Sequence, residues 1–328
     1  MNISVCILAD EPRAACDRET EAALAETISN TIKGLRRSPR PPREVIVAAP
    51  MGNRLPLPEA SFPVRLVKLA EGDASPMRAR NAVARDARGD LLVFLDPSCI
   101  PSPAMLDDYA AAAQRRRGVI AGEVGFLPQG ATATGVDFAH FQKVALAHPE
   151  RPDPAGGTVM QGGDASGFWG LNFAVKATDL KVIGGFDEKY GEAEFGLADF
   201  ARRAEARGLA PQWIAGAKAF HQFRALAMPP VERLDAILAD AGRFQTRWGV
   251  PAGESWLRAF TLMGLATPDA ARGEGHWRKL RDPRETDLAL ARQPDGQVWP
   301  GSERLLELLE DRTVLRLDAK GRSGSAAA

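Results

Sequence analysis

The sequence Gly89-Asp90-Leu91-Leu92-Val93-Phe94-Leu95-Asp96-Pro97-Ser98-Cys99-Ile100-Pro101 decides how this chain folds. Its five consecutive apolar residues, bounded by polar and chain-breaking ones, predict a strand that is buried on both faces. Asp96 follows at the point where this strand leaves its sheet. Ligands of open α/β sheets bind at the carboxyl ends of the strands, so Asp96 is a candidate ligand or metal contact. The alternative is that Asp96 only caps a turn.

Strands and helices alternate on both sides of this segment. Before it, the hydrophobic pattern predicts strands over residues 3–8, 44–49 and 64–69 and helices over residues 19–35 and 78–86. After it, the pattern predicts helices over 105–116, 178–183 and 197–207, strands over 119–126 and 170–175, and a partly helical excursion over 128–167. Strand–helix–strand order at this spacing implies parallel pairing with right-handed crossovers. We therefore predict an α/β fold with a mainly parallel central sheet flanked by helices.

The composition is that of an ordinary globular protein, with 328 residues of which 45% are hydrophobic and 26% charged. Lysine and arginine total 42, as do aspartate and glutamate, so the zero net charge gives no support to nucleic-acid binding. Three cysteines without metal-site spacing fit a reducing compartment. The sequence shows neither the run of ~20 apolar residues that a membrane helix needs nor a signal-peptide layout. We expect a cytoplasmic protein.

Several short motifs stand in a fixed order around the strand before Asp96. They are Arg80-Asn81, Gly89-Asp90, Trp169-Gly170-Leu171-Asn172, Gly184-Gly185-Phe186-Asp187-Glu188, Asp199-Phe200-Ala201-Arg202-Arg203 and Phe244-Gln245-Thr246-Arg247-Trp248-Gly249. Over about residues 1–250 the chain resembles the family 2 glycosyltransferases of the GT-A fold. The family has an ARN helix, a GD–strand–DxD unit, a G-x-N-x-A strand, a GGFDE turn and an acidic catalytic helix. The resemblance implies a Rossmann-like GT-A fold that transfers a sugar from a nucleotide-diphospho-sugar.

The resemblance also implies the residues that would hold the donor. Arg80, Asn81 and Asp96 match positions that contact the nucleotide diphosphate, whose departure needs a divalent cation or fixed positive charge. Mg²⁺ and Mn²⁺ prefer carboxylate oxygens, which the DxD motif supplies. Here the second acid is replaced by Ser98, which predicts a weakened metal site. His221 stands where some family members place a late metal ligand, with an ordinary core or surface histidine as the alternative.

Recognition of the nucleotide base is altered relative to the family. The second strand normally ends in acidic residues that contact the base, whereas this chain has Ala48-Ala49-Pro50 there. Asp10 and Glu11, which follow the first strand, are the candidates that could take over contacts with the base or ribose. The donor's identity therefore stays open at this point.

The catalytic base is the least clear element. In an inverting transferase a carboxylate takes the proton of the acceptor hydroxyl. The family places an acidic pair where this chain has Gly196 and Leu197. Glu192, Glu194 and Asp199 are the remaining candidates, and we favour Glu194 because a loop position before the helix would let it turn into the mouth of the site. The alternative is that these acids only favour the helix dipole.

The resemblance implies an acceptor side lined by Trp169, Asn172, Asp187 and Glu188. The alternative for Trp169 is a core aromatic residue. We predict an inverting glycosyltransferase that acts on a glycan, lipid-linked or other acceptor. The alternative is a non-catalytic GT-A-like binding or scaffold protein, because the metal motif, the base contacts and the acidic pair are all altered together.

The remaining sequence suggests how the chain divides. We assign residues 1–228 to a GT-A-like domain for nucleotide-sugar and acceptor, 229–320 to a mostly helical appendage and 321–328 to a flexible tail. The basic, proline-rich stretch 36–43 predicts a solvated loop, with contact to anionic lipid at the inner face of a membrane as the alternative.

Overall fold

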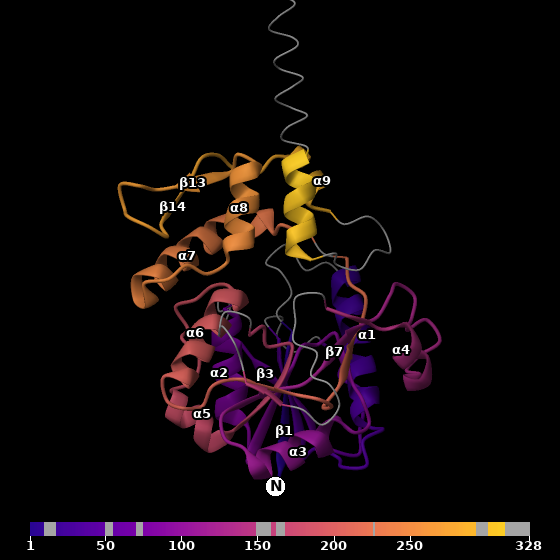
Figure 1. Ribbon diagram of the computed structural model, residues 1–328. Helices are drawn as coiled ribbons and strands as arrows, with labels where there is room; N and C mark the ends of the chain where they lie inside the picture. Colours follow the sequence, from indigo (N-terminus) through magenta and orange to yellow (C-terminus); the bar gives the residue numbers. More distant parts are fainter. Residues whose placement is uncertain are drawn as a thin grey trace, which may run out of the picture. The chain divides into compact units, whose positions relative to one another are not determined.

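The computed structural model describes residues 1–9, 18–49, 55–69, 75–148, 159–161, 168–225, 227–292 and 301–311. The chain divides into two compact units, Met1–Phe223 and Arg224–Ala328 (Figure 1). The roles assigned to the two parts of the sequence stay predictions.

A sheet of eight described strands forms the centre of the first unit. Its order is β3 (Val64–Lys68), β2 (Glu44–Ala49), β1 (Ile3–Leu8), β4 (Leu91–Leu95), β10 (Asn172–Lys176), β6 (Val119–Ala121), β11 (Gln212–Ile214) and β9 (Val159–Gln161). The four strands from β3 to β4 run parallel, whereas β10 runs antiparallel to both of its neighbours. The prediction of a mainly parallel α/β sheet is confirmed.

Helices flank this sheet on both sides. Figure 1 shows α2 (Pro76–Asp86), α5 (Ala177–Ile183) and α6 (Ala193–Glu205) on one side and α1 (Arg18–Leu35) on the other. α3 (Met105–Arg115) follows the Asp96 segment along the chain. Every residue of β1, β2 and β4 is buried, as expected for parallel strands that are covered on both faces. This burial fixes the strand ends and hence the position of Asp96.

A second, smaller sheet continues from the carboxyl end of the first. Its described order is β5 (Cys99–Pro101), β12 (Ala219–His221), β7 (Val124–Phe126) and β8 (Leu146–Ala147), with α4 (Phe138–Val144) between β7 and β8 in the chain. The single strand predicted over 119–126 is therefore wrong, because the chain changes sheets between β6 and β7. Gly122 makes this crossing possible, since a Cβ there would lie 2.4 Å from the Ala217 carbonyl oxygen.

The helix predicted over 197–207 begins four residues earlier, because α6 spans Ala193–Glu205. Gly196 lies inside this helix although glycine is a poor helix former. A Cβ at Gly196 would lie 2.4 Å from the Met77 sulfur, so the glycine lets α6 pack closely against α2. The placement of Glu194 in a loop before the helix is corrected by the same observation.

The second unit is mostly helical, as predicted for the C-terminal appendage. It contains the short 3-10 helix η3 (Val231–Arg233), α7 (Leu234–Trp248), α8 (Glu254–Leu262) and α9 (Glu285–Ala291), with a hairpin of β13 (Ala266–Pro268) and β14 (Trp277–Lys279). Buried Asp287, in the first turn of α9, joins this helix to the segment before it. Its carboxylate accepts hydrogen bonds from the Arg281 side chain and, at 2.8 Å, from the Arg284 backbone N–H. Among the described helices, none is long and apolar enough to span a membrane.

Candidate active site

Asp96 lies directly beyond β4, at the carboxyl edge of the parallel strands. Its backbone N–H donates to the Leu171 carbonyl oxygen at 2.8 Å, and its Oδ1 accepts from the Ser98 backbone N–H at 2.8 Å. The carboxylate therefore caps its own turn. Because the Asp96 side chain also keeps 21% of its surface exposed, it can still reach a ligand.

His221 and Asp96 lie side by side although the sequence separates them widely. β12 pairs with β5 so that His221 stands opposite Cys99, and His221 Nε2 lies 3.8 Å from Asp96 Oδ1. The structure thus brings the two predicted metal ligands together. No group of three or more His, Cys, Asp or Glu side chains suited to a metal occurs among the described residues. Asp10 and Glu11, predicted to contact the donor, lie outside the described residues.

An imidazole nitrogen and a carboxylate oxygen are a suitable but incomplete ligand set for a divalent cation. Imidazole nitrogens and carboxylate oxygens both serve as ligands of divalent metal ions. A cation bound by only one or two protein groups completes its coordination shell with phosphate oxygens and water. Ser98, the second DxD position, is only 2% exposed. It is therefore poorly placed to join a ligand shell on the surface.

The turn after Asp96 is stabilised by hydrogen bonds from α1 and from Gln222, the residue after His221. Thr31 Oγ1 donates to the Pro97 carbonyl oxygen at 2.7 Å. The Gln222 backbone N–H donates to the Ser98 carbonyl oxygen at 2.8 Å. Asn30 Nδ2 in turn donates to Gln222 Oε1 at 2.9 Å. Sequence reasoning missed this clamp. The available signal was polar Thr31 within the apolar stripe of the helix over 19–35.

Cys99, at the end of the same turn, is chemically quiet. Burial, with a smaller contribution from the charge of Asp96, raises the pKa of the Cys99 thiol well above its usual range. The thiol therefore stays protonated near neutral pH, so it is neither a nucleophile nor a thiolate ligand.

Asn81 holds the GGFDE turn. Its Nδ2 donates to the Phe186 carbonyl oxygen and to Glu188 Oε1, both at 2.8 Å, and its Oδ1 accepts from the Phe186 N–H at 2.9 Å. Gly185 adopts a φ of +67°, and a Cβ there would lie 2.9 Å from Asn81 Oδ1. The observed contacts give Asn81 a structural role, and its predicted contact with the donor stays a prediction.

The other residues predicted around this turn are also held locally. Arg80 is only 6% exposed and donates to the Pro76 carbonyl oxygen of its own helix at 3.1 Å. Glu188 Oε2 lies 3.3 Å from Arg78 Nε, and Asp187 Oδ1 accepts from the Lys189 backbone N–H at 3.1 Å. Their roles toward donor and acceptor stay predictions.

The three candidate bases occupy different environments. Asp199 is fully buried and its Oδ2 accepts from Arg203 Nε at 2.7 Å, so an arginine one helical turn further along holds it. Arg203 also donates to the Gly185 carbonyl oxygen at 2.8 Å. Glu192 is the N-cap residue of α6 and is 4% exposed, whereas Glu194 lies in the first turn with an exposed side chain.

An aromatic wall extends from His221 along one side of the site. The Phe126 ring centroid lies 5.1 Å from that of His221 and 5.7 Å from that of Trp169, and the rings of Trp169 and His148 are 4.7 Å apart. A pocket of about 150 Å³ lies against this wall, lined by Gly122, Glu123, Val124, Gly125, Ala145, Leu146, Ala147, His148, Trp169, Trp213 and Lys218. It combines aromatic faces with a carboxylate and an ammonium group.

Asn172 lies beneath this pocket rather than in it. It is 3% exposed, its Oδ1 accepts from the Tyr109 hydroxyl at 2.7 Å, and its Nδ2 donates to the carbonyl oxygens of Glu123 and Ala217 at 3.0 and 2.7 Å. The side chain therefore joins β10 to the two segments that surround the pocket. Its predicted contact with an acceptor stays a prediction.

Comparison with known proteins identifies the fold. No family model and no curated protein sequence matches the chain. The structure of GalNAc-T7 with UDP, GalNAc and Mn²⁺ matches with a TM-score of 0.51 and 13% identity over 80% of this chain and 50% of that one. The structure of Staphylococcus aureus TarS residues 1–349 matches with a TM-score of 0.45 and 13% identity, over 74% of this chain and 64% of that one.

Both of these structural neighbours are glycosyltransferases. The chain has an α/β fold similar to that of the GT-A glycosyltransferases, and the likeness at this identity shows the fold alone. The chain spans only half the length of GalNAc-T7. Membership of family 2 stays a prediction, because no family model supports it.

Proposed function

We propose that this protein is a cytoplasmic glycosyltransferase that takes its sugar from a nucleotide-diphospho-sugar. The observation that carries the proposal is the meeting of Asp96 and His221 at the carboxyl edge of the sheet, with 3.8 Å between their side-chain atoms. Ligands of such sheets bind at this edge. The GT-A-like fold adds support, since GalNAc-T7 holds UDP, GalNAc and Mn²⁺ on a similar fold.

Asp96 and His221 would hold a divalent cation, Mg²⁺ or Mn²⁺, together with the diphosphate oxygens of the donor. A bound cation neutralises charge that develops on the departing nucleoside diphosphate. The chain itself supplies the position of the two ligands, because the sheet register fixes Asp96 and the β5–β12 pairing fixes His221. With buried Ser98 at the second DxD position, we expect weak binding of the cation before the nucleotide arrives.

The acceptor is proposed to lie against the aromatic wall. The half-buried Trp169 ring offers an apolar face on which a sugar ring could stack. Glu123 and Lys218, 3.8 Å apart in the same pocket, offer an acceptor and donors for hydroxyl groups. This composition suits a glycan or the sugar part of a lipid-linked acceptor.

An inverting reaction would also need a base, and Glu194 is our candidate. Asp199 is already bound to Arg203 and buried, and Glu192 is buried at the helix N-cap. Glu194 is the candidate with an exposed side chain. An exposed carboxylate at the start of α6 is accessible to a hydroxyl whose proton it could accept.

Binding of the nucleotide is the first test. Thermal unfolding is measured with UDP, GDP or dTDP, each with and without Mn²⁺, because a ligand that binds the folded state raises its stability. We expect one nucleotide to raise the unfolding temperature only with Mn²⁺, and Asp96→Ala to remove that shift. Asp235→Ala, an exposed acid of the second unit, is the matched control. Equal shifts in wild type and Asp96→Ala, or none with any nucleotide, would reject the donor site.

A non-catalytic GT-A-like binding or scaffold protein is the second candidate. It is favoured by the burial of Ser98 and by the engagement of Asp199 with Arg203, which leave both reactive motifs incomplete. The two candidates differ in turnover. If the nucleotide-sugar that binds is neither transferred nor hydrolysed, the binding protein is the correct description.

A further inference from the structure

The connector between α1 and β2 carries a strong local excess of positive charge. Residues 36–43 read Arg36-Arg37-Ser38-Pro39-Arg40-Pro41-Pro42-Arg43, and all four arginines are exposed. The formal net charge of the whole chain is zero. The excess is therefore a feature of this surface and not of the composition.

Only part of this charge is neutralised within the protein. Arg40 Nε lies 2.6 Å from Asp107 Oδ1 of α3. The side chains of Arg36, Arg37 and Arg43 form no ion pair with any residue that the structure describes. Three guanidinium groups are thus available to an external anion, and a fourth would be if Asp107 lost its charge.

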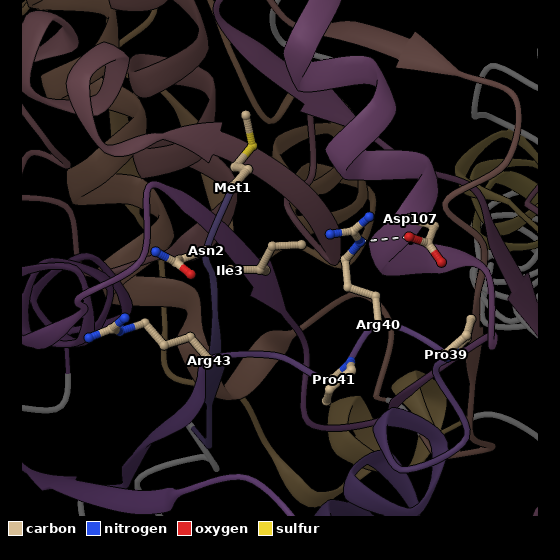
Figure 2. A pocket seen from close by; sticks show the side chains of 8 residues that line it. All are labelled: Met1, Asn2, Ile3, Pro39, Arg40, Pro41, Arg43 and Asp107. Atoms are coloured by element: carbon tan, nitrogen blue, oxygen red, sulfur yellow. Dashed lines mark hydrogen bonds and ion pairs between the residues drawn. The ribbon is translucent and has the colours of Figure 1, made fainter.

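These charges spread along the surface instead of meeting at one point. Figure 2 shows an open pocket beside the connector, in which Arg40 points toward Asp107 and Arg43 points away from both. The pocket has a volume of about 490 Å³ and is lined by Met1, Asn2, Ile3, Pro39, Arg40, Pro41, Arg43 and Asp107. A single phosphate would need converging donors, whereas an array of anionic groups suits separate arginines.

We propose that this arginine surface docks the protein onto an anionic lipid bilayer. Clusters of four or more basic residues are drawn to the negative surface potential of such membranes. A single-stranded nucleic acid would need aromatic side chains for stacking, and none lines this pocket. An added peptide strand would need backbone N–H groups, which Pro39, Pro41 and Pro42 lack.

The geometry also fixes which edge of the sheet faces the membrane. The Arg43 N–H donates to the Ile3 carbonyl oxygen at 2.8 Å, so the connector lies at the amino ends of the parallel strands. Ile3 pairs with Leu91, and Asp96 follows the five residues of β4. At about 3.3 Å per residue the two edges are about 17 Å apart. That exceeds the screening length of about 8 Å at physiological salt, so each edge can be tested separately.

Docking by this edge would turn the candidate donor site away from the bilayer. This consequence rests on the proposed function. A sugar acceptor would then meet the enzyme in the aqueous phase, or at the far end of a long glycan, and not at the lipid headgroup.

Vesicle co-sedimentation of the full chain tests the docking. We expect binding to phosphatidylcholine vesicles that contain phosphatidylglycerol, little binding to phosphatidylcholine alone, and release by salt. The combined variant Arg36→Gln, Arg37→Gln and Arg43→Gln should lower the partition coefficient about 100-fold, since each basic residue contributes about fivefold. The matched control removes the same charge from exposed positions elsewhere, by Arg207→Gln, Arg272→Gln and Arg278→Gln.

Two further variants examine the ion pair inside the surface. Asp107→Asn should strengthen vesicle binding several-fold because it frees Arg40, whereas Arg40→Gln should weaken it less than Arg43→Gln. The proposal would be overturned if vesicle binding did not depend on the phosphatidylglycerol content, or if the triple variant bound vesicles as well as the wild type does. Binding to heparin without binding to vesicles would also overturn it, by identifying a polyanionic macromolecule as the partner. Mn²⁺-dependent nucleotide binding should be unchanged in the triple variant, so the donor site can fail or succeed independently.

Discussion

The two residues proposed as metal ligands, here called the metal end, and the three acids considered as the base, here called the base end, lie in different environments. At the metal end, Asp96 and His221 lie 3.8 Å apart, and their role as metal ligands stays a prediction. At the base end, three candidate acids occupy a buried ion pair, a helix N-cap and an exposed first turn. The two side chains of the metal end thus lie together, whereas one of the three acids of the base end has an exposed side chain.

The difference follows from what positions each residue. Asp96 is fixed by a strand end, and β4 lies between two neighbours that set its register. Changing that register by one residue would turn every side chain to the other face. A helix start has no such constraint, because backbone N–H groups of the first turn can be satisfied in several ways. Strand ends are therefore the more reliable guide to a site.

The largest expected effect concerns the buried pair at the base end. Asp199→Ala would leave Arg203 buried without its carboxylate partner, which typically costs about 3–5 kcal/mol. We expect the free energy of unfolding in urea to fall by that amount. The double variant Asp199→Leu with Arg203→Met should recover much of the loss. If Asp199→Ala keeps full stability but loses transfer activity, Asp199 is the base and the structural role is wrong.

The next effect concerns the exposed acid. Glu194→Gln should lower kcat by about 100-fold, because general-base assistance is typically worth 10²–10⁴-fold. Donor affinity and the unfolding temperature should change little, since the Glu194 side chain is exposed. Glu192→Gln is the matched control. A larger loss of kcat in Glu192→Gln would move the base to the N-cap position.

Much of the fold was predictable because the buried strands have a simple pattern. The bounds predicted for β1, β2 and β4 are those observed, since continuous apolar runs bounded by breakers leave few alternatives. Gly184 and Gly185 adopt positive φ values of 90° and 67°, a conformation that glycine adopts readily. Local signals were sufficient in these places.

The errors arose where tertiary contacts override local signals. At Gly122, where β6 ends, the Ala217 carbonyl oxygen occupies the space of a side chain, and at Gly196, inside α6, the Met77 side chain of α2 does the same. The same limit applies to the site. The resemblance named Asp96 and His221 as candidate metal ligands, but the hydrogen bond between Asn30 and Gln222, which supports the turn after Asp96, joins residues 192 positions apart.

The metal end predicts a smaller effect at its second ligand. His221→Ala should raise the Mn²⁺ concentration needed for nucleotide binding about tenfold, which corresponds to a loss of about 1.4 kcal/mol. The effect should be smaller than that of Asp96→Ala, because a carboxylate also supplies negative charge. Exposed His140→Ala is the control. Unchanged Mn²⁺ dependence in His221→Ala would remove His221 from the ligand set and reduce the metal end to one residue.

The smallest expected effect concerns the anchor of the strand register itself. Glu44 joins the amino ends of the strands, because its Oε1 accepts from Ser4 Oγ and from the Arg88 N–H, both at 2.7 Å. Burial acts to raise the pKa of Glu44, but these hydrogen bonds and those from Arg65 outweigh it, so the pKa lies below its ordinary value.

A pKa that is lower in the folded state stabilises the fold above the unfolded pKa, which is about 4.3 for glutamate, and this stability is lost as pH falls further. We therefore expect Glu44→Gln to lower stability by on the order of 1 kcal/mol at neutral pH. The deficit should shrink below about pH 4, where wild-type Glu44 also becomes protonated. Urea unfolding at several pH values measures this. A deficit that does not depend on pH would show that the Glu44 charge contributes nothing to the anchor. The anchor would then consist of hydrogen bonds that a protonated Glu44 also makes, together with the burial of the apolar strands.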